Sequence, residues 1–149
     1  MALHTEIQLA SEAADIPVEA SLERWAAAAW QGDEDEASVV IRVVDEAESA
    51  ELNGTYRHKQ GPTNVLSFPF EAPPEFAEGH LGDLVICAPV VLREAAEQGK
   101  TAEAHWAHMV IHGMLHLQGH DHIEDAEAAR MEALEKEILS GLGYENPYE

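Results

Sequence analysis

Residues 108–122 read His-Met-Val-Ile-His-Gly-Met-Leu-His-Leu-Gln-Gly-His-Asp-His, and the interpretation of the whole chain depends on this stretch. His112 and His116 are four residues apart, so on a helix both imidazoles lie on one face and can reach one ion. Gly119 can end that helix in a left-handed turn, and the chain can then fold back and bring His122 to the same point. The pattern predicts three neutral nitrogen ligands for one divalent metal, and zinc fits such ligands best.

Three protein ligands leave a fourth coordination position open, which is typical of a catalytic zinc that activates water. The spacing His-x3-His-x2-Gly-x2-His is also that of the metzincin proteases, whose general base is a Glu directly after the first His. Gly113 occupies that position here, which argues against a protease. His108 is either a group that supports the ligands or contacts substrate, or simply a polar residue at the edge of the site. His120 is expected to be exposed in the turn.

The composition limits the classes of protein to consider. A chain of 149 residues with 46% apolar residues fits one globular domain. Cys87 is the single cysteine, so no internal disulfide can form, which suits the cytosol; we interpret it as a core residue. No apolar run reaches the ~20 residues of a membrane span and no signal-peptide pattern begins the chain, so we expect a cytoplasmic protein without membrane contact. The net charge of -21 argues against extensive nucleic-acid contacts, so RNA binding would need local positive charge.

The order of the secondary-structure signals indicates the fold class. Strands are predicted at residues 3–9, 39–44, 65–68 and 81–87, and helices at 17–31, from Asp45 to Asn53-Gly54, at 89–97, from Thr101 through the metal-binding histidines, and at 124–142. Pro69 suggests that the third strand lies at or near a sheet edge. Inner stripes are expected at Leu22, Trp25, Ala26 and Ala29, and at Met131, Leu134, Ile138 and Leu142. The acidic run 33–36 should be a solvated turn and residues 72–80 an exposed loop. We predict a single α+β domain over residues 1–149, a metal-dependent hydrolase, with a small mixed four-stranded sheet, helices packed over it and the metal site on a C-terminal helix.

Positive charge is scarce, and its densest point lies at Arg57 and Lys59, just before the turn 62–64. A lone Arg is usually a surface residue that aids solubility. A guanidinium beside a zinc ion, however, could clamp a phosphate and stabilise the charge that develops during phosphodiester cleavage. We therefore hypothesise that Arg57 lies next to the metal.

Several motifs together resemble one known family, the YbeY endoribonucleases of bacteria, which are linked to ribosomal RNA maturation and ribosome quality control. They are Leu-Asn-Gly-Thr-Tyr-Arg-His-Lys at 52–59, Pro-Thr-Asn-Val-Leu-Ser-Phe-Pro at 62–69, Gly-Asp-Leu at 82–84, the histidine motif at 112–122, Met-Glu-x-Leu-Glu at 131–135 and Gly-Tyr at 143–144. The similarity covers most of the chain, although the first ~50 residues agree only in layout. Two positions depart from the family pattern: His120, where Tyr is more usual, and Gln60, where an acidic residue is more usual.

The resemblance implies one zinc ion per chain held by His112, His116 and His122, with Arg57 as the functionally important basic residue. It also implies single-stranded RNA as substrate and the small ribosomal subunit as partner. We expect Arg57 and Lys59 to line a local positive groove for RNA, with an affinity that falls as salt rises, and we expect no DNA substrate.

These observations predict a zinc-dependent, single-strand-specific endoribonuclease that matures the 3′ end of small-subunit ribosomal RNA and acts in ribosome quality control. Arg57 is the predicted catalytic residue, and Asp121 and His108 are both candidates for the general base. Two alternatives stay open: a non-enzymatic ribosome-assembly factor with a structural zinc and, less favoured, a metzincin-like metalloprotease.

Overall fold

A computed structural model of the protein describes residues 2–13, 16–31, 36–69, 80–119 and 125–148. Its elements are β1 (Ala2–Ala10), α1 (Glu19–Ala29), β2 (Glu36–Val44), α2 (Glu46–Arg57), β3 (Val65–Pro69), β4 (His80–Cys87), α4 (Ala88–Glu97), α5 (Ala102–Leu117) and α6 (Asp125–Gly141). Most of the predicted acidic turn and of the predicted loop lies outside the described residues, as do His120, Asp121 and His122. In the described part of the chain, no helix is long and apolar enough to cross a membrane.

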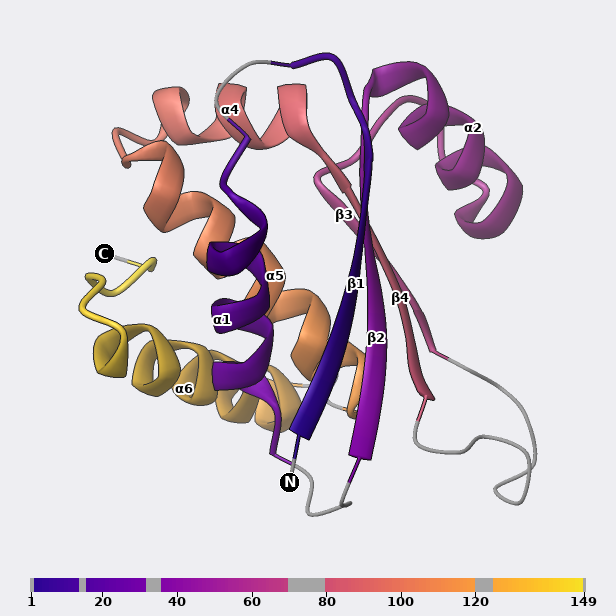
Figure 1. The fold of residues 1–149 in the computed structure, drawn as a ribbon. Coiled ribbons are helices and arrows are strands. Elements are labelled where there is room, and N and C mark those ends of the chain that lie inside the picture. The colour runs from indigo at the N-terminus through magenta and orange to yellow at the C-terminus, as the bar shows by residue number, and fades with distance from the viewer. Residues whose placement is uncertain (1, 14–15, 32–35, 70–79, 120–124, 149) are drawn as a thin grey trace.

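The four strands form one mixed sheet in the order β1-β2-β4-β3 (Figure 1). β1 pairs with β2 and β2 with β4 in parallel, whereas β3 runs antiparallel to β4. β3 is therefore an edge strand, as Pro69 predicted. The α+β class and the mixed four-stranded sheet are confirmed.

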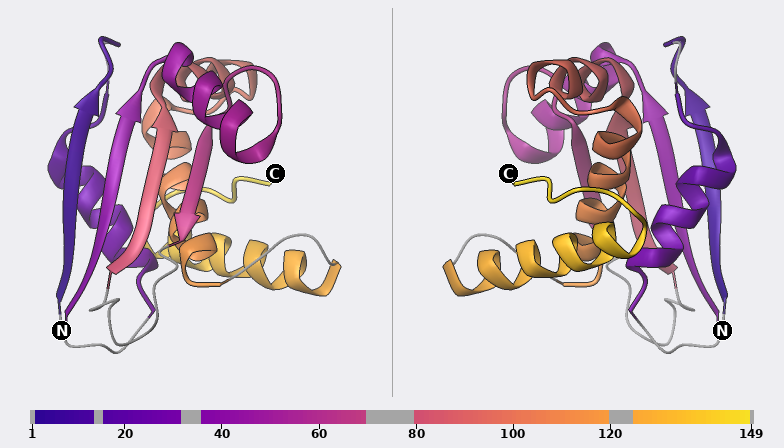
Figure 2. Two further views of the ribbon diagram at one scale, coloured as in Figure 1. Left: turned by 90° about the vertical axis from the view of Figure 1, so that its right-hand side faces the viewer. Right: turned by 90° about the vertical axis from the view of Figure 1, so that its left-hand side faces the viewer.

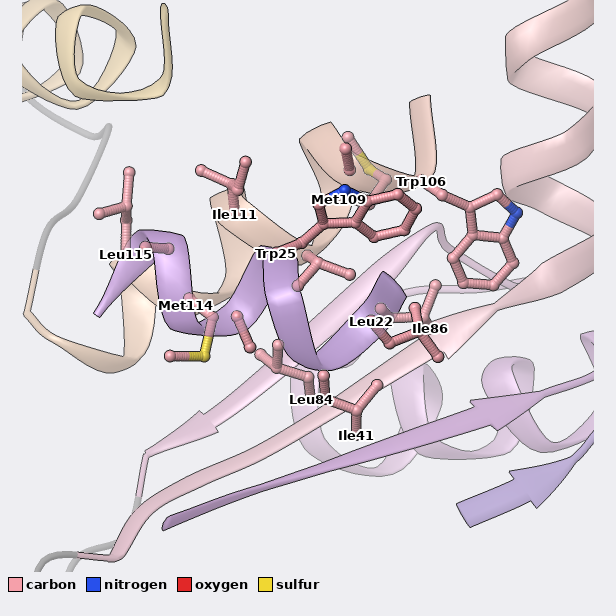
Figure 3. Packing of buried hydrophobic residues seen from close by; sticks show 14 of the residues in the cluster. Leu22, Trp25, Ile41, Leu84, Ile86, Trp106, Met109, Ile111, Met114 and Leu115 are labelled. Carbon is pink, nitrogen blue, oxygen red and sulfur yellow. The ribbon is translucent and has the colours of Figure 1, made fainter. Parts of the chain in front are cut away.

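The larger core lies between one face of the sheet and helices α1 and α5 (Figure 1). Alternate residues of the central strands point to this face, because successive side chains of a strand face opposite ways. They are Val39, Ile41 and Val43 of β2 and Leu84 and Ile86 of β4. Figure 3 shows several of them packed against Leu22 and Trp25 of α1 and against Trp106, Ile111 and Met114 of α5. The predicted inner stripe of α1 is confirmed, since Leu22, Trp25, Ala26 and Ala29 are all fully buried.

The opposite face of the sheet carries a smaller core, which α2 partly covers (Figure 1). Val44, Leu66, Val85, Cys87 and Val90 form it, with Leu52 of α2 and Phe68 packed against them. Cys87 is fully buried, in agreement with its predicted role as a core residue.

Helix α5 packs against β3 and β4 of the sheet and also contacts helices α1, α4 and α6. Figure 2 shows α6 running across the strand direction, after which the chain turns back over it to the C-terminus. This burial explains why α5 is apolar around most of its circumference. Both predicted ends are confirmed: the Thr101 side chain accepts the Ala104 N–H at 3.1 Å, and Gly119 has a φ of 96°.

The predicted end of α2 at Asn53-Gly54 is wrong, because the helix continues to Arg57 and the left-handed residue is His58, with a φ of 57°. Asn53 is buried, and its side-chain amide donates to the Gly61 carbonyl at 2.9 Å. Its backbone carbonyl accepts the Lys59 N–H at 3.3 Å. Asn53 thus anchors the following loop from inside the helix, and Arg57 lies in the last helical turn.

Candidate metal centre

His112 and His116 lie next to each other on α5, as the four-residue spacing predicts. Their ring centroids are 4.7 Å apart and the rings meet edge to face. Both side chains are half-buried, so the pair can be approached from solvent. The third predicted ligand, His122, lies outside the described residues.

A carboxylate lies behind His112. His108, one turn earlier on α5, is hydrogen-bonded through Nε2 to Glu135 of α6. The Nδ1 of His112 lies 3.5 Å from the same carboxylate oxygen, at the outer limit of a hydrogen bond. Ligand atoms of His108, His112 and Glu135 all lie within 4.8 Å of one another, so this group could hold a metal ion. Glu135 is only 1% exposed and His108 8% exposed. Of the three histidines His108, His112 and His116 along α5, His108 is therefore the buried one.

Glu135 is surrounded by groups that stabilise its charge. Burial alone would raise its pKa, but the hydrogen bonds and charges of His108 and His112 outweigh burial and lower the pKa to about 2. The Tyr148 hydroxyl also donates to this carboxylate, at 2.9 and 3.1 Å from its two oxygens. Burial and the Glu135 charge together raise the pKa of Tyr148. The result is an ionised buried carboxylate with three donors around it.

Two sequence interpretations change here. The interpretation of His108 as a polar residue at the edge of the site is wrong, because His108 is buried and bonded to Glu135. Glu135 was not predicted as a site residue, since the predicted inner stripe of α6 does not include it. Its sequence signal is its spacing: Glu135 lies four residues from Met131 and from Leu139, both buried. A carboxylate within a buried stripe needs hydrogen-bond partners, and a histidine-rich helix can provide them.

The close packing of α5 on the sheet explains the glycine at position 113, which the sequence alone did not. A Cβ atom on Gly113 would lie 2.7 Å from Cδ2 of Leu84 and 3.4 Å from the Ser67 hydroxyl. Helix α5 therefore packs directly on β3 and β4 at this residue. A side chain at the position that holds the catalytic Glu of metzincins would force Leu84 to move.

Arg57 is anchored at the open edge of β3. Its Nη2 donates to the Ser67 carbonyl at 2.6 Å, and its guanidinium lies 5.7 Å from the centre of the Phe68 ring. Asn64 accepts a backbone hydrogen bond from Cys87 of β4, so by the alternation of an antiparallel ladder the Ser67 carbonyl points away from β4. Arg57 donates a hydrogen bond to this outward-pointing carbonyl.

Ser67 connects Arg57 to the histidine helix. Its hydroxyl donates to the Gly113 carbonyl at 3.4 Å, directly next to His112 in the chain. Arg57 itself is exposed. Lys59 is also exposed, and its backbone N–H closes the end of α2. The fold thus brings Arg57 to Ser67, a strand residue that contacts α5 at Gly113, although Arg57 and Gly113 are more than fifty residues apart in sequence.

Comparisons with known proteins identify the family of this chain. Residues 6–143 match the model of the family described as Endoribonuclease YbeY. A protein of that name from Methylococcus capsulatus (strain Bath) is 64% identical over 142 residues, which are 95% of this chain and 93% of the relative. The solution structure of a Thermotoga maritima protein superposes with a TM-score of 0.58 at 30% identity, and the match covers 90% of this chain and 87% of that one. The motif resemblance is confirmed, and the chain belongs to the YbeY family.

Proposed function

We propose that this protein is a zinc-dependent, single-strand-specific endoribonuclease. In this proposal it acts in the cytoplasm on ribosomal RNA of the small subunit, at its 3′ end, and in ribosome quality control. The observation that carries the proposal is the His112–His116 pair on α5, beside a strand whose open edge holds Arg57. The family description, which names an endoribonuclease, supports the same reaction class.

His112, His116 and His122 would hold one zinc ion. The residues fit this role because the first two present imidazole rings 4.7 Å apart on a half-buried helix face. Imidazole nitrogen is a preferred ligand of zinc. When bound, the zinc supplies Lewis-acid chemistry, which polarises a phosphoryl oxygen or a water molecule.

Arg57 would bind the scissile phosphate and stabilise the negative charge that develops on it. A guanidinium has five N–H donors in a planar fork, and the contact with Ser67 accounts for one nitrogen only. The Ser67 carbonyl and the Phe68 ring orient the group before substrate arrives, which lowers the cost of ordering it. Lys59, exposed two residues later, would contact the RNA backbone as a point charge.

The surroundings of His108 disfavour one of the two candidates for the general base. His108 is a poor candidate, because it is buried and its Nε2 is engaged by Glu135. A base must come within hydrogen-bond reach of the proton that it takes up. Asp121 therefore stays our candidate for this role.

Cleavage of labelled single-stranded RNA by wild-type protein and by His116→Ala, purified identically, tests the proposal. We expect cleavage by the wild type only, its loss on chelation and its return with added zinc. Duplex RNA, single-stranded DNA and a peptide library serve as alternative substrates. Equal cleavage by both proteins would indicate a contaminating nuclease and contradict the proposal. Zinc binding without turnover of any substrate would favour the assembly factor, and peptide turnover would favour a protease.

A further inference from the structure

We propose that Glu135 is a positioning residue for the metal centre, and that Tyr148 at the C-terminal end of the chain holds Glu135 in place. This inference rests on the proposed role of His112 as a metal ligand. It assigns functions to two residues outside the histidine motif, one on α6 and one in the tail that follows it.

The direction of each hydrogen bond follows from the contacts of Glu135, whose two oxygens face a hydroxyl and imidazole nitrogens, all groups that can donate. An ionised carboxylate can only accept hydrogen bonds, so every neighbouring polar group must present a hydrogen to it. His108 donates from Nε2 and Tyr148 from its hydroxyl. His112 faces the same oxygen with Nδ1, 3.5 Å away. Glu135 therefore favours the tautomer of His112 that carries its hydrogen on Nδ1.

This tautomer decides which nitrogen of His112 can bind a metal. A neutral imidazole with hydrogen on Nδ1 has its lone pair on Nε2. Nδ1 of His112 lies 3.5 Å from Glu135, whose side chain is 1% exposed, whereas the His112 side chain as a whole is 24% exposed. Histidine ligands of metals generally donate their other N–H to a carboxylate or carbonyl, and loss of that partner typically costs ~10- to 100-fold in metal affinity.

Glu135 can orient His112 only if it is itself fixed, and the C-terminal tail contributes to this. The Tyr148 hydroxyl contacts both carboxylate oxygens, and Lys136 lies 5.8 Å from the centre of the Tyr148 ring. The preceding Pro147 carbonyl accepts a hydrogen bond from Nζ of Lys100 at 2.7 Å. The tail is thus anchored to the segment that precedes α5 and to α6.

The same geometry argues against Glu135 and His108 as ligands themselves. Their side chains bond directly to each other, so the nearest nitrogen of His108 carries a hydrogen and has no lone pair for a metal. Both are also nearly excluded from solvent, whereas a catalytic metal needs an open position. They suit a supporting role better than a coordinating one.

The test compares zinc affinity, measured by competition with a chromophoric chelator, for wild type, Glu135→Gln, Tyr148→Phe and His116→Ala. Glu137→Gln is the matched control, because Glu137 is an exposed residue of the same helix and the change in charge is identical. We expect Glu135→Gln to bind zinc ~10- to 100-fold more weakly. Tyr148→Phe should lose less affinity than Glu135→Gln but clearly more than Glu137→Gln, which should match the wild type. Nitrogen-15 NMR of the metal-free protein should show His112 protonated on Nδ1 in the wild type, and less so in Glu135→Gln.

The outcomes separate this inference from the proposed function. If wild type binds no zinc, or His116→Ala binds it equally well, the proposed metal site is wrong and the inference fails with it. If those two behave as expected but Glu135→Gln matches Glu137→Gln, only the positioning role is wrong. If Glu135→Gln loses as much affinity as His116→Ala, Glu135 is a ligand and not a positioning residue. Should Glu135→Gln fail to fold, Tyr148→Phe decides, since Tyr148 is 45% exposed, and an unchanged affinity would overturn the inference.

Discussion

Arg57 shows how a single exposed side chain can be ordered without being buried. One of its nitrogens is bound to a backbone carbonyl of the edge strand, and an aromatic ring lies beside the guanidinium plane. Because the carbonyl belongs to the main chain, its position depends on the sheet and not on a flexible partner. Among the residues that the structure describes, no other group takes up the remaining donors, so they can meet a ligand in a fixed orientation.

Replacement of Arg57 should reduce RNA cleavage and leave folding stability nearly unchanged. We expect Arg57→Ala to lower the cleavage rate by ~10²- to 10³-fold, the usual effect of removing a donor that stabilises developing negative charge. Arg57→Lys should recover only part of this loss, since a lysine keeps the charge but not the planar fork. Single-turnover cleavage measures both rates. A free energy of unfolding within about 0.5 kcal/mol of wild type, expected for a surface change, is the control. Full activity of Arg57→Ala would contradict the assigned role.

Asp45 should show a pKa below its ordinary value, with a consequence for stability in acid. The Ser11 hydroxyl and the Glu12 backbone N–H both donate to its carboxylate and lower its pKa. Because the folded pKa is the lower one, this contribution to stability is present above the unfolded pKa and is lost as the pH falls through the folded pKa. Carbon-13 NMR titration of the carboxylate measures the pKa directly. Ser11→Ala should raise it towards the ordinary value, and an unchanged pKa would show that the Ser11 contact is unimportant.

At the scale of elements, the packing of α5 against the sheet positions the site. α5 carries both histidines, and it approaches β4 so closely at Gly113 that a methyl group would collide with Leu84. Ser67 of β3 contacts the same turn of α5 and also receives Arg57. This one crossing therefore brings the basic residue and the histidines to the same part of the molecule.

Two glycine substitutions separate the cost of this packing from helix propensity. Gly113→Ala should destabilise the protein by about 1–3 kcal/mol through overpacking against Leu84. Gly54→Ala, in helix α2 with its nearest neighbour 3.8 Å from the added Cβ, should instead stabilise by up to about 1 kcal/mol. Urea denaturation of both variants measures the difference. Equal effects of the two substitutions would show that the α5–β4 approach can relax without cost.

At the scale of the whole molecule, a net charge of -21 opposes the binding of a polyanion. Arg57 and Lys59 are the basic residues that the proposed RNA site contains. With about two phosphate contacts, the logarithm of the RNA association constant should fall with the logarithm of salt with a slope of about -1.4, taking -0.7 per contact for a single strand.

Binding titrations with His116→Ala, which should leave the RNA intact, measure this slope. Adding Arg57→Ala should make it shallower by about 0.7, the value of one contact. Arg24→Ala is the control, because Arg24 is an exposed residue of α1 outside the proposed RNA contacts and the change in charge is identical. A slope several times steeper would indicate a larger basic surface elsewhere.

The sequence by itself determined the features that depend on local periodicity. His112 and His116 lie side by side because their four-residue spacing matches the helical repeat, and the Thr101 cap and the Gly119 turn depend only on neighbouring residues. Pro69 signalled an edge strand because proline has no N–H for a sheet hydrogen bond. The α+β class and the family could also be recognised before the structure was known. The zinc, the role of His122 and the ribosomal RNA substrate stay predictions.

Only the tertiary structure decided which distant residues support the site. Glu135 lies more than twenty residues after His112, and Tyr148 lies more than thirty residues after it. No local sequence pattern links either residue to His112. Gly113 lets α5 lie directly on Leu84, a contact that neither segment shows by itself. The end of α2 was mispredicted for the same reason, since Asn53 is buried inside the helix and its side chain bonds to Gly61 across the loop. Propensities describe what a segment can form alone, whereas burial and hydrogen bonding between segments select what it forms in the fold.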